Sequence, residues 1–390
     1  MTRQHALMAL TVAIAAFATF TKPPTAHAAS LPNPPNNLCI EDSGGCVPPV
    51  AGSSHGVKWH PGHYVLTPGY MTTTSLGYTS STISALASEP NIVGVVHRIY
   101  WAALEPTRGN YDFSKLDALL ALCQANGKRL IIDVWDRTYG GGSSAEGYLP
   151  AYLATEPGGE GGWFARERGG VMARIWLPAI MDREIALARA LAAHVTGGYT
   201  LDTHPYVEGF TFTEESAADI NNGDPASYSR SALATQLNRL AAALPLAWPH
   251  SNVFGGANFL SGEMDAMVGS AVANRAGIAG PDTIPGKPTA AQRVFPGQTE
   301  AGGTGIDYRG KVPALFMVQR AEIGGTKGNF TPQQIYDVSL TYGTTHLPWL
   351  MKPSDATTTD WPNEILPFVR AGGHPLNTTC PTRYTSCNTN

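Results

Sequence analysis

Two segments of the 390-residue sequence end in glutamates that could act on one substrate. Glu214 and Glu215 follow an apolar run at 207–213, and Glu322 follows a second apolar run at 313–320. Both runs are short enough to be buried strands. A protonated carboxyl group that assists a leaving oxygen, facing an ionised carboxylate, can cleave a glycosidic bond. These glutamates are therefore the first candidates for catalysis.

Such carboxyl groups must be held across a gap by rigid elements, and the strand pattern provides them. Short apolar runs alternate with amphipathic stretches, which is typical of repeated β–α units. Eight strands are expected, at 63–67, 93–101, 129–135, 207–213, 252–257, 277–280, 313–320 and 347–351. Helices are predicted at 112–126, 178–194, 227–244, 262–275, 331–342 and 361–370.

This alternation predicts an α/β fold, a single (β/α)8 TIM barrel over residues 61–375. The alternative is a doubly wound open sheet, which usually has fewer strands and a glycine-rich phosphate-binding turn after the first. Residues 67–70 follow the first strand and lack that fingerprint. In a barrel, residues at the ends of strands four and seven both lie at the carboxyl-terminal mouth.

Residues 1–28 are predicted to be a signal peptide. Arg3 supplies the positive start, residues 6–20 are apolar but too short to span a membrane, and residues 25–29 carry a small-residue cleavage pattern. Residues 29–60 are rich in Pro, Gly, Asn and Ser and predict an irregular leader, and residues 376–390 form a C-terminal tail. We therefore expect a secreted or periplasmic protein.

The composition argues against several classes of partner. Without the signal peptide the chain has 24 Lys and Arg against 30 Asp and Glu, so no electrostatic hold on nucleic acid or an anionic membrane is expected. Charged residues make up only 14% of the chain, and Gly and Pro number 42 and 30, which is typical of a loop-rich extracellular enzyme. We expect a monomer that acts on a carbohydrate.

The five cysteines divide by position. In an oxidising compartment, Cys39 with Cys46 and Cys380 with Cys387 are expected to close two small loops. Crossed pairs that join the two ends of the chain are the alternative. Cys123 lies on an apolar helical face, so we expect a buried, inert thiol rather than a nucleophile.

A long insertion follows the third strand, at 136–177. It is rich in glycine and carries the aromatic residues Tyr139, Tyr148, Tyr152, Trp163, Phe164 and Trp176. Loops after the strands build the active-site face of a barrel, so this loop is expected to form one wall of a cleft. A surface loop without function is the alternative.

Further candidates lie in or near the ends of the strands. Arg98, inside the second strand, could orient Glu322 and keep it ionised through its positive charge. Aromatic rings cover the apolar faces of sugars, which makes candidates of Trp101, Trp135 and Trp349. The polar candidates after strands three and six are Asp133, Asp136 and Asp282. His97 and His346 are better explained as structural histidines.

Three segments resemble the clan of retaining barrel glycosidases that includes the family 5 cellulases, the family 10 xylanases and the family 42 β-galactosidases. Residues 98–106, continuing through 109–117, resemble the clan's second strand and the turn after it. Residues 321–325 resemble the nucleophile segment on strand seven. Residues 346–349 resemble strand eight, which usually ends in a sugar-stacking tryptophan. The resemblance implies a distant member with the same barrel.

The resemblance also implies roles for the glutamates. It makes Glu322 the nucleophile, and it favours Glu214 over Glu215 as the acid/base, because the clan's acid/base follows an asparagine at the end of strand four. Thr213 stands at that position here. The asparagine amide holds the sugar 2-hydroxyl in the clan, and threonine has a shorter reach. Either another group makes this contact, or the substrate lacks the usual equatorial hydroxyl, or the family is a distant one. Thr213 and Glu215 remain candidates for substrate binding.

The sequence therefore predicts a secreted glycoside hydrolase that cleaves a poly- or oligosaccharide with retention, which requires carboxyl groups about 5 Å apart. A catalytically inactive carbohydrate-binding barrel is the alternative, because Thr213 departs from the pattern. No cofactor is expected. A metal site is not expected either, since the sequence has no H-E-x-x-H, no H-x-H after the first strand and no paired C-x-x-C.

Overall fold

The computed structural model describes residues 56–139, 142–156, 161–167, 169–212, 225–256, 260, 262–281, 283–286, 306–319, 329–351 and 361–390. Several residues singled out above lie outside these ranges: residues 1–28, predicted to be a signal peptide, and Cys39, Cys46, Thr213, Glu214, Glu215, Asp282 and Glu322.

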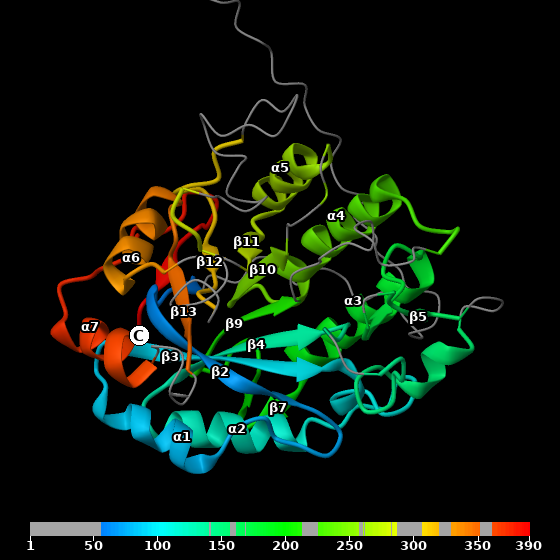
Figure 1. Ribbon diagram of the computed structural model, residues 1–390, viewed down its shortest axis with the longest axis horizontal. Helices are drawn as coiled ribbons and strands as arrows, with labels where there is room; N and C mark the ends of the chain where they lie inside the picture. The colour runs from blue at the N-terminus through cyan, green and yellow to red at the C-terminus, as the bar shows by residue number, and fades with distance from the viewer. Residues whose placement is uncertain are drawn as a thin grey trace, which may run out of the picture. The chain divides into compact units, whose positions relative to one another are not determined.

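Eight parallel strands close into a barrel (Figure 1). In order around the barrel they are β2 (Gly62–Met71), β3 (Ile92–Tyr100), β4 (Arg129–Trp135), β9 (Val207–Phe212), β10 (Asn252–Gly256), β11 (Gly277–Gly280), β12 (Ala314–Phe316) and β13 (His346–Leu350). β13 pairs in parallel with β2 and completes the ring. The predicted (β/α)8 architecture is confirmed.

Helices pack around the outside of the strands (Figure 1). They are α1 (Ser80–Ser84), α2 (Ser114–Ala125), α3 (Pro178–Ala193), α4 (Arg230–Ala247), α5 (Met264–Asn274), α6 (Pro332–Thr341) and α7 (Leu366–Ala371). A π-helical turn at Trp361–Ile365 precedes α7, and 3-10 turns lie at Ala85–Ser88, Trp101–Ala103 and Ala151–Ala154. α6 begins at the capping box between Thr331 and Gln334, with Pro332 at its first position.

The strands separate two apolar regions because their side chains alternate between the two faces. One set fills the barrel interior: Tyr64, Leu66, Val96, Ile131, Phe254, Ala279, Leu315 and Met317. The other set faces the helices and packs with their buried side chains, among them Cys123 of α2, which is buried as a free thiol. Burial raises the pKa of Cys123 to about 12, so the expected inert thiol agrees with its environment.

The amino-terminal end of the barrel is closed by residues from both ends of the described chain. β1 (Val57–Lys58) pairs with β14 (Cys387–Asn388), so the segment predicted to be irregular up to residue 60 contains a short strand. The Cys380–Cys387 disulfide, predicted from the spacing, closes the tail beside it. Trp59 and Tyr384 pack together here, with their ring centres 6.2 Å apart. We call this end of the barrel the floor and the carboxyl end the mouth.

Some elements differ from the sequence-based expectation. β2 continues to Met71 through Pro68 and Gly69, with a register shift between Leu66 and Tyr70. Strand seven is shorter than predicted, and Val318 makes only an isolated bridge to β13. Two hairpins were not anticipated: β5 (Trp163–Ala165) with β6 (Val171–Ala173) in the long insertion, and β7 (Val195–Thr196) with β8 (Tyr199–Thr200) after α3.

Candidate active site at the mouth of the barrel

Arg98 lies inside the barrel near the mouth and contacts β2, β4 and the residue that follows β12. Its guanidinium donates to the hydroxyl of Tyr70 on β2 at 3.1 Å and lies 3.6 Å from the sulfur of Met317, just beyond β12. Its Nε lies 3.8 Å from a carboxylate oxygen of Asp133 on β4. Asp133 and Met317 are both buried. Arg98 therefore places a positive charge across the lumen, from strands one to three toward strand seven.

An aromatic layer surrounds this cation. The Arg98 guanidinium lies 4.8 Å from the ring centre of Trp135 and 5.3 Å from that of Tyr70, both distances at which a cation is attracted to a ring face. The Trp135 indole donates to Asp133 at 3.0 Å, which fixes both side chains. Tyr100 stacks on Tyr70 with ring centres 5.1 Å apart. The ends of β2, β3 and β4 nearest the mouth thus carry aromatic rings around the buried ion pair of Arg98 and Asp133.

The insertion after β4 extends this aromatic layer. Tyr148 meets Tyr100 with ring centres 4.8 Å apart, and Tyr139 meets Trp135 at 5.7 Å. Arg166, on the β5–β6 hairpin, lies 5.0 Å from the ring centre of Tyr139. These contacts place the described part of the insertion beside the mouth, and its role as one wall of a cleft stays a prediction.

The loop is tied to the barrel by a buried carboxylate. Glu105 has no exposed surface and accepts hydrogen bonds from the indole of Trp101 at 2.8 Å and the hydroxyl of Tyr152 at 3.0 Å. It also accepts from the backbone N–H of Gly109 at 2.8 Å and pairs with Arg183 on α3. In the segment that resembles the clan's second strand and turn, Glu105 therefore has a structural role, because it joins this segment to the insertion and to α3.

Two of the predicted sugar-stacking tryptophans belong to the core. Trp101 is fully buried among the side chains outside the barrel and donates to Glu105. Trp349 is also fully buried, faces the helices and donates to His63 at 3.0 Å. Neither ring has surface to offer a ligand, because alternation along the strand turns each away from the lumen. Trp135 is the one of the three that faces the mouth.

The predicted catalytic residues lie outside the described ranges. β9 ends at Phe212, directly before Thr213, Glu214 and Glu215, and the described residues after β12 end at Gln319, three positions before Glu322. Asp282, between two described residues at the end of β11, also lies outside the description. Of the predicted site residues within the described ranges, Arg98, Asp133 and Trp135 lie together at the mouth, whereas Trp101 and Trp349 lie in the core.

Sequence reasoning missed Tyr70 and Glu208. Pro68 and Gly69 are typical of a turn, so the sequence predicts that the first strand ends before Tyr70. Glu208 lies in an apolar run, and the signal that could have found it is that a charge inside a buried strand needs partners. It occupies a bulge where β4 and β9 shift register, because Leu130 aligns with Val207 and Ile131 with Gly209.

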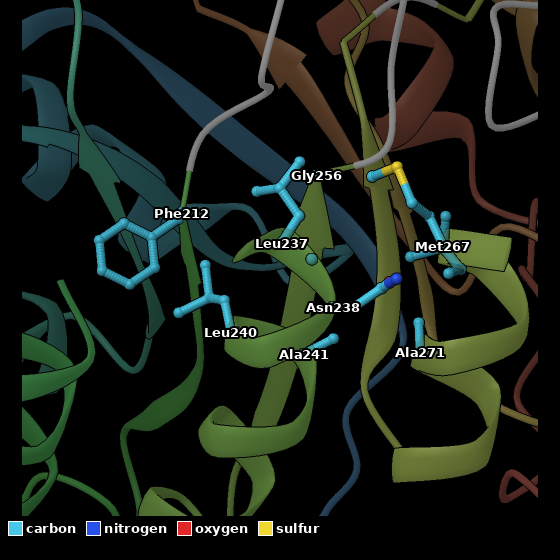
Figure 2. A pocket seen from close by; sticks show the side chains of 10 residues that line it. Phe212, Leu237, Asn238, Leu240, Ala241, Gly256, Met267 and Ala271 are labelled. Carbon is cyan, nitrogen blue, oxygen red and sulfur yellow. The ribbon is translucent and has the colours of Figure 1, made fainter. Parts of the chain in front are cut away.

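A small cavity lies outside the barrel wall rather than at the mouth (Figure 2). Its volume is about 30 Å³, room for little more than a water molecule, and residues of β9, β10, α4, α5 and β11 line it. Asn238 is the only strongly polar side chain in its lining. The cavity is too small for a sugar and has no titratable group, so we do not assign it a catalytic role.

Two further observations concern the described ranges alone. Within them, no group of three or more His, Cys, Asp or Glu side chains is arranged to hold a metal ion. Nor does any helix in these ranges combine the length and apolar character required to cross a bilayer.

No protein-family model matches the chain, and no curated protein matches it in sequence. Solved structures do resemble it. The catalytic domain of β-amylase from Paenibacillus polymyxa superposes with a TM-score of 0.51 at 9% identity, covering 75% of this chain and 92% of that one. Endo-glycoceramidase II from Rhodococcus sp. gives a TM-score of 0.51 at 12% identity, with 82% and 81% covered. At such identities the likeness establishes the shared barrel fold.

Proposed function

We propose that this protein is a secreted glycoside hydrolase that cleaves a poly- or oligosaccharide. The observation that carries the proposal is the arrangement at the mouth, where Arg98 crosses the lumen between Asp133, Trp135 and Met317. The fold is shared with a β-amylase and an endo-glycoceramidase, which supports a carbohydrate substrate. Aromatic surface combined with a few fixed polar groups is what sugar binding requires.

In the proposed reaction Glu322 attacks the anomeric carbon, and the bond to the leaving oxygen breaks as Glu214 donates its proton. Water deprotonated by Glu214 then releases the sugar with its configuration retained. Arg98 supports this assignment because its guanidinium reaches the sulfur of Met317, five positions before Glu322 in the chain. A fixed cation near strand seven favours the ionised form of a nucleophilic carboxylate.

The test compares single substitutions across a panel of cello-, manno-, xylo- and gluco-oligosaccharides. Glu322→Ala and Glu214→Ala are each expected to reduce turnover by about a thousandfold, because each removes a group that acts in the transition state. Glu215→Ala should retain far more activity if Glu214 is the acid/base. Glu364→Ala, a half-buried glutamate beside α7, is the matched control and should match the wild type. A fully active Glu322→Ala protein would overturn the assignment.

The inactive binding barrel makes the opposite prediction for the wild type. It would retain glycans in affinity electrophoresis and release no reducing ends even at high protein concentration. The departure at Thr213 is what keeps this second function under consideration.

A further inference from the structure

Tyr139 stands apart from the other rings at the mouth. Trp135 and Tyr100 are buried, whereas Tyr139 keeps 44% of its surface exposed although it sits directly against Trp135. An exposed large aromatic side chain that continues a buried aromatic layer is a common feature of ligand-binding surfaces.

The backbone directly before Tyr139 is held by β6 and by Arg166. The N–H of the preceding Thr138 donates to Val171 on β6 at 2.8 Å, and the Val171 N–H returns a bond to the Thr138 hydroxyl at 3.0 Å. Arg166 donates to the Thr138 carbonyl at 3.0 Å. The ring is therefore presented on a braced segment rather than on a free loop, so little conformational entropy is lost when a ligand packs on it.

The contacts of the ring define how a ligand could approach. The Arg166 guanidinium lies over the ring at 5.0 Å, and Trp135 meets it at an interplanar angle of 75°. Exposed surface remains beyond these two contacts. Trp135 in turn contacts Arg98 in the lumen. Tyr139 is thus one ring farther out than Trp135 along a continuous set of contacts that starts at the candidate catalytic site.

We propose that Tyr139 is a stacking platform for a sugar unit distant from the bond that is cleaved. Sugar rings present apolar C–H faces, and a braced aromatic ring at the rim covers such a face well. This inference rests on the proposed function, and it makes the substrate a chain of several sugars rather than a short glycoside. A ligand that reaches both Arg98 and Tyr139 must extend past Trp135.

The test uses Tyr139→Ala, Tyr139→Phe and, as a matched control, Tyr199→Ala. Tyr199 is 49% exposed, and it lies on the β7–β8 hairpin that follows α3, at the floor. For oligosaccharides from disaccharide to hexasaccharide, Tyr139→Ala should lower kcat/KM about three- to tenfold on the longest members, with the loss shrinking as the chain shortens. Tyr139→Phe and Tyr199→Ala should follow the wild type at every length. An equal loss at every length, or none, would overturn the platform.

A binding assay separates this inference from the catalytic proposal. The full-length variants are run in native gels that contain hydroxyethylcellulose, galactomannan or arabinoxylan. If the wild type turns over none of the oligosaccharides but is retarded by one polymer, loss of retardation in Tyr139→Ala alone supports the platform while the hydrolase proposal fails. If Tyr139→Ala is retarded as strongly as the wild type, or if no polymer retards the wild type and none is cleaved, the platform is wrong.

Discussion

The floor and the mouth of this barrel treat buried charge differently. At the floor, Glu208 is fully buried and accepts hydrogen bonds from the backbone and ring of His60 at 2.9 and 2.7 Å and from Asn252 at 2.8 Å, with His346 at 3.3 Å. Burial alone would raise the pKa of this carboxyl group, but the hydrogen bonds and charges of the two histidines hold it below its ordinary value. Glu208 is thus surrounded by donors.

The mouth is built the other way. Arg98 has aromatic rings and a sulfur atom as close neighbours, and its Nε is 3.8 Å from Asp133, too far for a hydrogen bond. That nitrogen has no hydrogen-bond partner within the described ranges. A buried charged group whose hydrogen bonds are all made stabilises a fold, whereas a charged group with an unused hydrogen-bond donor can act on a ligand. We therefore expect the charge at the floor to stabilise the fold and the charge at the mouth to act in the proposed reaction.

Removing the carboxylate at the floor should have the largest effect on stability. Glu208→Ala leaves the buried donors of His60, Asn252 and His346 without their acceptor, and it should cost about 3 to 5 kcal/mol in the free energy of unfolding. Glu208→Gln keeps an acceptor oxygen and should cost less. Urea unfolding followed by tryptophan fluorescence measures both. A Glu208→Ala protein as stable as the wild type would remove the structural role given to the floor.

Replacing an arginine by lysine should reduce activity at the mouth and leave it nearly unchanged at the floor. Arg98→Lys keeps the charge but loses the planar fork, and kcat/KM should fall about a hundredfold with little change in unfolding temperature. Arg129→Lys, at the start of β4, changes an arginine that donates to the carbonyl of Pro205, and activity should stay within about twofold. Equal effects of the two changes on activity would contradict the division between floor and mouth.

Lowering the pH should destabilise the protein through His97, a buried histidine that does not belong to the mouth. Burial lowers the pKa of His97 from 6.5 to about 4, and the positive charge of Arg98 also lowers this pKa. The hydrogen bond to the carbonyl of Leu76 acts in the opposite direction. The folded state therefore binds fewer protons than the unfolded chain as the pH falls from 6.5 toward 4, and stability is lost over that range. From pH 7 to pH 5 this should amount to about 2 kcal/mol.

The control for this pH effect is His97→Gln, measured by thermal unfolding at several pH values. It should lose less stability than the wild type between pH 7 and pH 5, although His63, whose pKa burial also lowers to about 4, continues to contribute. If the variant and the wild type lose stability in parallel, His97 does not carry the effect.

Periodicity predicted most of the barrel because strands buried on both faces and amphipathic helices leave strong patterns. β4 and β11 have the predicted bounds, and α2 to α6 lie within three residues of theirs at each end. The short elements were missed for a physical reason. β1 and β14 are two residues each and exist only because distant segments pair, which no local pattern records.

The site was harder to predict than the fold because facing direction depends on register. Trp101, Trp135 and Trp349 all lie near strand ends, yet only Trp135 points into the lumen. A shift of one residue in strand register moves a side chain to the opposite face of the strand. The bulge at Glu208 and the register shift before Tyr70 cannot be predicted from composition. Arg98 and Asp133 could be named in advance because they interrupt apolar runs.

The central claim is that Glu322 forms a covalent bond with the sugar, and a mechanism-based label tests it most directly. Wild-type protein and Glu322→Gln are incubated with activated 2-deoxy-2-fluoroglycosides of the sugars that are cleaved, and intact and peptide masses are recorded. The wild type should gain one fluoroglycosyl group on the peptide that contains Glu322, and Glu322→Gln should gain none. Labelling of a different residue, or undiminished turnover by Glu322→Gln, would contradict the account.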